Sequence, residues 1–330
     1  MIGVDDDDVV TFDESLQWQV RVCENAGAPV SAAVLRAIGT CAMEMHMPEV
    51  VRFADFIPLR LLAAMHALAL DRRASFLALM LPTVGGGGAA EPEAMRSAVA
   101  QAFAAGPEVI AEYLSSPPQT NEVGRAHPLR IALAEVGVDQ PVHVREIGSS
   151  AGLLLNVDRL ELMPGEREWQ EPRISSRLGY DIHPIDASTS AGRLRLSSYV
   201  WPDHVERFAR LGAAIRVAQE FPPAVRRLDA VTALQQMELA PRSTTFVWHS
   251  ALLPYLSQPE RAQVTANFER LGSQTTETSR FAVASWEVPA HGQAHRLAFE
   301  LLLTVWSAGQ ATTRVLADGN SHGTEVNLRG

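Results

Sequence analysis

The segment from Val142 to Asn156 has the residue types and spacing most suited to ligand binding. Val142 and Val144 alternate with polar residues, as in a short strand, and Glu146 is followed by small residues and then by apolar residues at helical spacing. A strand, a tight small-residue turn and a helix form the first unit of a nucleotide-binding α/β fold. Small side chains let a ligand approach the backbone, and a helix start presents free N–H groups. An acid at the strand end accepts hydrogen bonds from an amine or a ribose hydroxyl.

This turn matches the known glycine-rich motifs only in part. The dinucleotide motif G-x-G-x-x-G is absent, because the glycines stand at Gly148 and Gly152 only. The first motif of methyltransferases, acid-x-G-x-G-x-G, is matched by Glu146, Gly148 and Gly152, with Ser150 in place of the middle glycine. We expect these residues and Ser149 to bind S-adenosylmethionine, which has no pyrophosphate to hold. The alternative is a tight turn with no ligand.

Two further acids follow predicted strands and complete the expected cofactor site. Asp186 follows the second strand, where an acid commonly binds ribose hydroxyls. It lies roughly twice as far from the turn as the usual spacing of about 20 residues, so Asp181 is a rival and a turn aspartate is an alternative. Asp229 and Ala230 follow the third strand, where a carboxylate and a small residue suit an adenine amino group. An N-cap of the next helix explains Asp229 equally well.

His249 and Glu287 are the candidate catalytic residues. His249 follows the predicted fourth strand, where it can line the cofactor pocket, act as a base or simply cap the sheet edge, and Glu287 follows the fifth strand. Tyr255 is a candidate wall of the substrate pocket. His291 and His295 have the spacing of two metal ligands on one helix face, but no third ligand accompanies them, so we expect no metal site.

A polar loop precedes the first predicted strand. Asn121, Glu122 and Arg125 lie in a stretch with neither helical nor strand periodicity. Such a loop can close over a cleft and contact the substrate, and an arginine can bind a carboxylate through two hydrogen bonds. The alternative is a structural loop whose side chains satisfy buried backbone groups.

The composition excludes several kinds of chemistry. The chain has 330 residues, 47% of them hydrophobic and 20% charged, with a net charge of −10. All 28 basic residues are arginine, so no lysine can form a Schiff base or bind a phosphate. There is no basic stripe, no signal peptide and no uninterrupted apolar run long enough for a membrane span. We therefore expect a cytoplasmic protein that binds a small-molecule substrate and binds neither nucleic acid nor membranes.

Hydrophobic periodicity divides the chain into two parts. Residues 1–138 are predicted to be all helical, with helices that include Phe12–Asn25, Phe53–Leu70 and Pro107–Leu114. Residues 139–330 alternate strands with helices, which favours a mainly parallel sheet with helices on both faces. The predicted strands are Val142–Glu146, a stretch ending near Ile185, Ala224–Leu228, Thr244–Trp248, Phe281–Ser285, Leu301–Ser307 and Thr312–Leu316. The predicted helices of this part are Leu153–Leu160, His204–Glu220, Leu234–Met237, Gln258–Leu271 and Ala294–Leu303, the last of which overlaps a strand. The final two strands form an antiparallel hairpin, an ending typical of class I methyltransferases.

Several motifs together resemble one bacterial family. They are Gln119–Arg125, Glu146–Leu153 with Asn156, Asp158 and Arg159, Arg177–Asp181 with Pro184–Asp186, and Trp201–Asp203 with Glu206 and Arg207. In these motifs the chain resembles the uncharacterised family called domain of unknown function 2332. The resemblance implies a Rossmann-like, methyltransferase-type domain behind a helical N-terminal region, and it implies no substrate.

The expected function is S-adenosylmethionine-dependent methyl transfer to an unknown small molecule. Methyl transfer requires in-line positioning and, in some cases, a base, so the lack of a covalent nucleophile is compatible with it. The alternative is a ligand-binding or regulatory protein that has the fold without the catalysis.

Overall fold

The computed structural model describes residues 9–41, 48–88, 91–137, 139–163, 165–166, 169–289 and 298–329. The chain forms two compact units, each built from two segments. The helical unit comprises Met1–Thr120 and Thr189–Gly212, and the sheet unit comprises Asn121–Ser188 and Ala213–Gly330. The units therefore do not follow the expected boundary after residue 138. Side chains of Asn121 and Arg130 hydrogen-bond to the backbone of Leu153 and Val157, which ties the segment before the sheet to the sheet unit.

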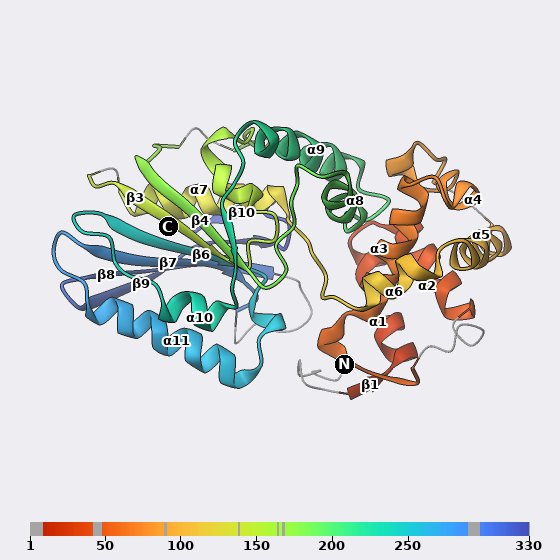
Figure 1. The fold of residues 1–330 in the computed structure, drawn as a ribbon, viewed down its shortest axis with the longest axis horizontal. Helices are drawn as coiled ribbons and strands as arrows, with labels where there is room; N and C mark the ends of the chain where they lie inside the picture. The colour runs from red at the N-terminus through yellow and green to blue at the C-terminus, as the bar shows by residue number, and fades with distance from the viewer. Residues whose placement is uncertain are drawn as a thin grey trace. The chain divides into compact units, whose positions relative to one another are not determined.

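Over the residues that the structure describes, the helical unit consists mainly of short helices (Figure 1). It also contains an antiparallel pair of strands, so the expectation of an all-helical N-terminal region is wrong. Its α-helices are α1 (Phe12–Asn25), α2 (Pro29–Cys41), α3 (Ile57–Leu70), α4 (Ser75–Ala78), α5 (Pro92–Ala105), α6 (Pro107–Leu114), α8 (Ser190–Ser198) and the first part of α9 (Val205–Glu220). The other elements are β1 (Val9–Thr11), β2 (Val50–Arg52), η1 (Phe53–Asp55) and η2 (Pro82–Val84). Helix α1 begins after Thr11 because that residue and Glu14 form a capping box.

Helix α3 passes through the core of the helical unit. The helix expected over Phe53–Leu70 is interrupted at Phe56, which has a φ of 48°, and Pro58 occupies the first turn of α3. By length and composition this stretch could cross a membrane, but core helices pass the same test and most of it is buried. Its buried His66 is satisfied on both ring nitrogens, by the Ser198 carbonyl at 3.2 Å and the Thr83 hydroxyl at 2.8 Å.

The sheet unit is built on one eight-stranded sheet. Its order is β10-β9-β8-β7-β6-β3-β4-β5, with the last five strands of this order parallel and β8 to β10 antiparallel. The strands are β3 (Val142–Ile147), β4 (Ile174–Asp181), β5 (Val225–Arg227), β6 (Thr244–Ser250), β7 (Arg280–Glu287), β8 (Ala298–Ser307), β9 (Gln310–Asn320) and β10 (Val326–Leu328). The expected α/β class, mostly parallel sheet and antiparallel C-terminal strands are confirmed. The predicted helix Ala294–Leu303 overlapped the predicted strand Leu301–Ser307, and residues 298–303 are strand in the structure.

Helices and short 3₁₀ segments connect and cover these strands. They are η3 (Val123–Arg125), α7 (Ala126–Glu135), η4 (Leu153–Arg159), α10 (Ala230–Gln235), η5 (Leu253–Tyr255), α11 (Gln258–Ser273) and the end of α9. Helices α10 and α11 lie on one face of the sheet and α7 on the other (Figure 1). The core beneath α10 and α11 includes Ile147, Tyr180, Val247 and Val283 of the sheet.

The order of the parallel strands creates a switch point. Along the sheet the strands run third, second, first, fourth and fifth in chain order, so connections leave β3 and β6 in opposite directions. In open α/β sheets ligands bind beyond the carboxyl ends of the strands at such a point. Glu146 and Ile147 lie at this end of β3, and Trp248 and His249 lie beside them on β6. The switch point therefore contains candidate residues that the sequence motifs indicated.

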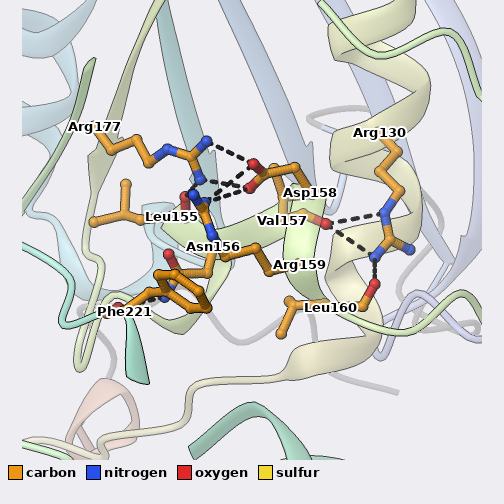
Figure 2. A network of polar contacts seen from close by, with 9 residues as sticks. All are labelled: Arg130, Leu155, Asn156, Val157, Asp158, Arg159, Leu160, Arg177 and Phe221. Atoms are coloured by element: carbon orange, nitrogen blue, oxygen red, sulfur yellow. Dashed lines mark hydrogen bonds and ion pairs between the residues drawn. The ribbon is translucent and has the colours of Figure 1, made fainter. Parts of the chain in front are cut away.

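The connection from β3 to β4 begins as a 3₁₀ segment rather than the expected α-helix over Leu153–Leu160. Asn156 has non-helical backbone angles, and its side chain donates to the Phe221 carbonyl at 2.9 Å. Figure 2 shows the polar network that fixes this segment, with Asp158 facing Arg177 and the Arg130 guanidinium reaching backbone carbonyls. Bonds from outside the segment thus replace those that a regular helix would make itself.

Candidate functional site

The turn after β3 keeps the backbone of a glycine-rich turn. Gly148, Ser150 and Gly152 all have positive φ values, of 72°, 52° and 69°. Ser150 therefore adopts the left-handed conformation that glycine favours, at a cost of about 1–3 kcal/mol for a residue with a side chain. A Cβ atom on Gly148 would lie 3.0 Å from the Leu252 side chain, so the turn and the loop after β6 are in close contact. Serine in the middle position thus preserves the shape of the turn.

The backbone N–H groups of the turn are largely used within the protein. Gly148 and Ser149 both donate to the Tyr180 carbonyl, and Ser150 donates to the Asp181 carboxylate at 2.8 Å. The N–H of Leu153, at the start of η4, donates to the Asn121 side chain at 3.0 Å. The sequence predicted free N–H groups at a helix start after the turn, and this prediction is wrong for Leu153, whose N–H is already hydrogen-bonded. The turn is not arranged as an anion cradle.

Several side-chain atoms at this edge are buried and lack partners. Glu146 is 3% exposed, and its Oε2 has no hydrogen-bond partner. The same is true of the hydroxyls of Ser149 and Ser150 and of the Trp248 indole N–H. Trp248 is the register neighbour of Glu146 on β6. Because buried polar groups in folded proteins are nearly always paired, this concentration at a switch point makes the edge a candidate ligand site.

Glu146 sits in an environment that disfavours its charge. Burial raises the pKa of its carboxyl well above the ordinary value, and the Asp181 carboxylate acts in the same direction. The Arg125 guanidinium opposes this and lowers the pKa, but less strongly than burial raises it. The free site therefore favours a neutral carboxylic acid on β3, beside Asp181 on β4.

The acids expected after the second and third strands lie at the surface. Asp186 is exposed and accepts the N–H of Ser188, as in the turn alternative. Asp229 is exposed and caps α10 by accepting the N–H of Thr232, as in the capping alternative, and Ala230 is buried beneath it. The second strand was expected to end near Ile185, but β4 ends at Asp181, so this rival residue occupies the strand end. The structure brings Asp181, not Asp186 or Asp229, into the electrostatic environment of Glu146.

The two candidate catalytic residues form a buried pair. His249 Nδ1 lies 2.8 Å from Glu287 Oε1, which also accepts the N–H of Leu252 at 2.9 Å. The ring of His249 stacks on Phe268 of α11 at 6.2 Å between centroids. A histidine held by a carboxylate at Nδ1 has its other nitrogen left for proton transfer. The contact with Leu252 also positions the loop that covers Gly148.

This pair and Glu146 project from opposite faces of the sheet. Side chains alternate along a strand, and Ile147 and Val247 face the core beneath α10 and α11. His249 points to the same side as these residues, as its stacking on α11 shows, whereas Glu146 points to the other side. The candidate cofactor and catalytic groups therefore share a sheet edge but not a face.

The polar loop before α7 belongs to the same edge. Arg125 donates to the carbonyls of Ser321 at 2.9 Å and Ser250 at 3.3 Å. Glu122 is buried and accepts the N–H of Gly124, while Asn121 caps η4. These bonds fit the structural-loop alternative, and they hold Arg125 near Glu146.

The remaining candidates are more peripheral. Tyr255 is 41% exposed in η5. His291 and His295 lie outside the described residues. Among the residues that the structure describes, no group of three or more His, Cys, Asp or Glu side chains is placed to hold a metal ion.

Sequence reasoning did not single out Trp248 or Leu252 for the site. Trp248 stood in a predicted strand, but its pairing with Glu146 depends on strand register. Leu252 acts through its backbone N–H and its contact with Gly148, and neither has a signal in a single sequence.

The chain matches one family model over residues 13–327, that of domain of unknown function 2332, described as an uncharacterized protein conserved in bacteria. The chain therefore belongs to this family, as its motifs indicated. No curated protein matches the chain. Four residues of the matching motifs, Asn156, Asp158, Arg159 and Arg177, lie in the network of Figure 2 and maintain the β3–β4 connection.

Proposed function

We propose that the protein binds S-adenosylmethionine at the carboxyl end of β3 and transfers its methyl group to a small molecule. The observation that carries the proposal is the buried, unpartnered Glu146 oxygen beside two unpartnered serine hydroxyls at the switch point. These groups suit the ammonium and hydroxyl groups of this cofactor. A turn whose N–H groups are already used suits a ligand without a pyrophosphate.

Glu146, Ser149 and Ser150 would hold the cofactor, with Gly148 permitting its close approach. When bound, the cofactor supplies an electrophilic methyl group. His249 would accept a proton from the methyl acceptor, and Glu287 would fix the ring so that Nδ1 donates and Nε2 accepts. Because His249 points away from the face of Glu146, the acceptor would have to reach it around the strand ends.

That opposite orientation favours a second candidate, a ligand-binding protein without catalysis. Glu287 Oε1 is engaged by both His249 and the Leu252 N–H, and this arrangement stabilises the loop whether or not a proton is transferred. Turnover of bound cofactor in the presence of an acceptor separates the two candidates. A protein that binds the cofactor but transfers no methyl group to a broad set of acceptors would support the second.

The first test is calorimetric titration of the full chain with S-adenosylmethionine and S-adenosylhomocysteine. We expect binding at about micromolar Kd, weakened at least about tenfold by Glu146→Gln, since a hydrogen bond to a charged group contributes about 1.5–3 kcal/mol. The matched control is Asp186→Asn, which changes an exposed turn carboxylate and should bind as the parent does. Equal losses in the two variants, or no binding to folded protein, would overturn the cofactor assignment.

A further inference from the structure

Two carboxyl groups on the neighbouring strands β3 and β4 differ in their hydrogen bonding. Asp181 accepts a backbone N–H on each oxygen, from Ser150 and His183, both at 2.8 Å. Glu146, on the neighbouring strand, is almost fully buried and has an enclosed oxygen with no donor. A buried carboxylate oxygen without a donor is disfavoured, so burial raises the pKa of Glu146 and favours the neutral acid.

The charges around Glu146 come from two elements of the sheet unit. Asp181 on β4 repels a second negative charge, and Arg125 of η3 attracts one. Trp248 on β6 is uncharged, with an indole N–H that can only donate. The Arg125 guanidinium donates to the carbonyls of Ser250 and Ser321, so it is directed by other acceptors. If Glu146 and Asp181 are both ionised, their two negative charges face the single positive charge of Arg125. One further positive charge beside Glu146 would make these charges equal.

We infer that the ligand of this edge carries a positive charge, and that this charge replaces the proton of Glu146 when the ligand binds. The inference rests on the proposed function, because S-adenosylmethionine carries both a sulfonium and an ammonium group. The neutral acid loses one proton to solvent, and the resulting carboxylate pairs with the cationic group. Proton and charge balance are complete without any other reactant.

Three probes distinguish the source of the charge. S-adenosylmethionine carries both cations, S-adenosylhomocysteine carries only the ammonium, and 5′-methylthioadenosine carries neither. Titration in two buffers of different ionisation enthalpy measures the protons released per ligand bound. A pH of about 6 keeps the ligand ammonium protonated, because α-amino groups have pKa values of about 7.7–8.0.

We expect a net release of protons when S-adenosylmethionine binds the full chain, and none when it binds Glu146→Gln. Asp186→Asn is the matched control and should release as many protons as the parent. S-adenosylhomocysteine releasing the same number assigns the charge to the ammonium, and its releasing none assigns the charge to the sulfonium. 5′-Methylthioadenosine should bind at least about tenfold more weakly, without proton release.

The outcomes separate this inference from the proposed function. Binding of S-adenosylmethionine without proton release overturns the inference alone. So does binding of 5′-methylthioadenosine as tightly as the cationic ligands. Failure of all three probes to bind folded protein overturns the proposed function and the inference that depends on it.

Discussion

The network around Arg130 and the edge around Glu146 belong to the same unit, yet they treat buried polar groups in opposite ways. The Arg130 guanidinium is 1% exposed and is surrounded by acceptors, including Val157, Leu160 and both oxygens of Glu166. Glu146 is about as deeply buried and has an oxygen with no partner. The satisfied network maintains the fold, and the unsatisfied edge is where a ligand would complete the hydrogen bonding. This distinction predicts how each region responds to substitution.

The largest effect is expected where a satisfied buried charge loses its partner. Arg130→Ala leaves the buried Glu166 side chain without its cation, which costs about 3–5 kcal/mol in free energy of unfolding. Urea unfolding followed by circular dichroism measures it. The matched control is Arg314→Ala, which breaks the exposed Arg314–Glu135 pair and should cost about 0–1 kcal/mol. Similar costs for the two variants would remove the energetic basis of the comparison.

The same reasoning extends to the satisfied His66 of the helical unit. Burial, the largest cause, lowers the pKa of His66 to about 4, although the Ser198 and Val200 carbonyls oppose the shift. Unfolded histidine titrates near about 6.5, so between these values the unfolded state binds more protons. Stability contributed by the neutral ring is complete above about pH 6.5 and falls by about 3 kcal/mol as the pH drops to about 4.

Urea unfolding between about pH 7 and pH 4.5 measures this loss against the variant His66→Gln. The variant removes the titrating ring, so its stability should depend less steeply on pH across this window. Identical pH profiles for parent and variant would show that carboxyl groups, not His66, govern the acid response.

A smaller effect is expected at the turn itself. Gly148→Ala adds a side chain at a φ of 72° and brings a Cβ atom to 3.0 Å from Leu252, so about 1–2 kcal/mol of strain is expected, together with weaker cofactor binding. Gly309→Ala is the control, because Gly309 has a φ of 74° but nothing within 4 Å. Calorimetry should find unaltered binding in the control. Loss of binding in both would show that strain alone, not the site, is responsible.

The smallest change in stability is expected at the unsatisfied carboxyl. Glu146→Gln replaces a neutral acid with a neutral amide and should alter the unfolding free energy by less than about 1 kcal/mol near pH 5. Because burial raises the pKa of Glu146, its stabilising contribution is complete below about 4.5 and is lost as the pH rises through the folded-state value. The parent should therefore lose stability relative to the variant at higher pH. A large penalty near pH 5 would reveal an ionised, partnered Glu146.

Much of the architecture follows from hydrophobic periodicity. The helices expected over Phe12–Asn25 and Pro107–Leu114 have those bounds, because strong apolar spacing coincides with end signals such as Asn25 before Gly27 and Pro107. Helix α8 was not predicted, since its sequence has no clear apolar stripe. The segment after Gly152 looked helical by spacing, but side chains distant in sequence impose 3₁₀ geometry on it.

The sequence predicts which residues lie at the carboxyl ends of the strands, but not which face of the sheet each side chain occupies. Glu146, His249 and Glu287 all lie at the carboxyl ends of buried strands, so their common edge follows from parallel pairing. Which side each faces depends on a register that no short motif encodes. Asp186 was favoured over Asp181 because the second strand was expected to end near Ile185, whereas β4 ends at Asp181.

The division of the helical unit between two chain segments has a consequence for biosynthesis. The carboxylate of Asp203 accepts the N–H groups of Val30 and Ser31, and Ser198 accepts from or donates to Tyr113, so each closure spans a large loop of chain. On the ribosome, helices α1 to α6 emerge long before these partners are made. The N-terminal segment alone is therefore an incomplete folding unit, and residues 189–212 must return to it after much of the sheet unit's sequence has been synthesised.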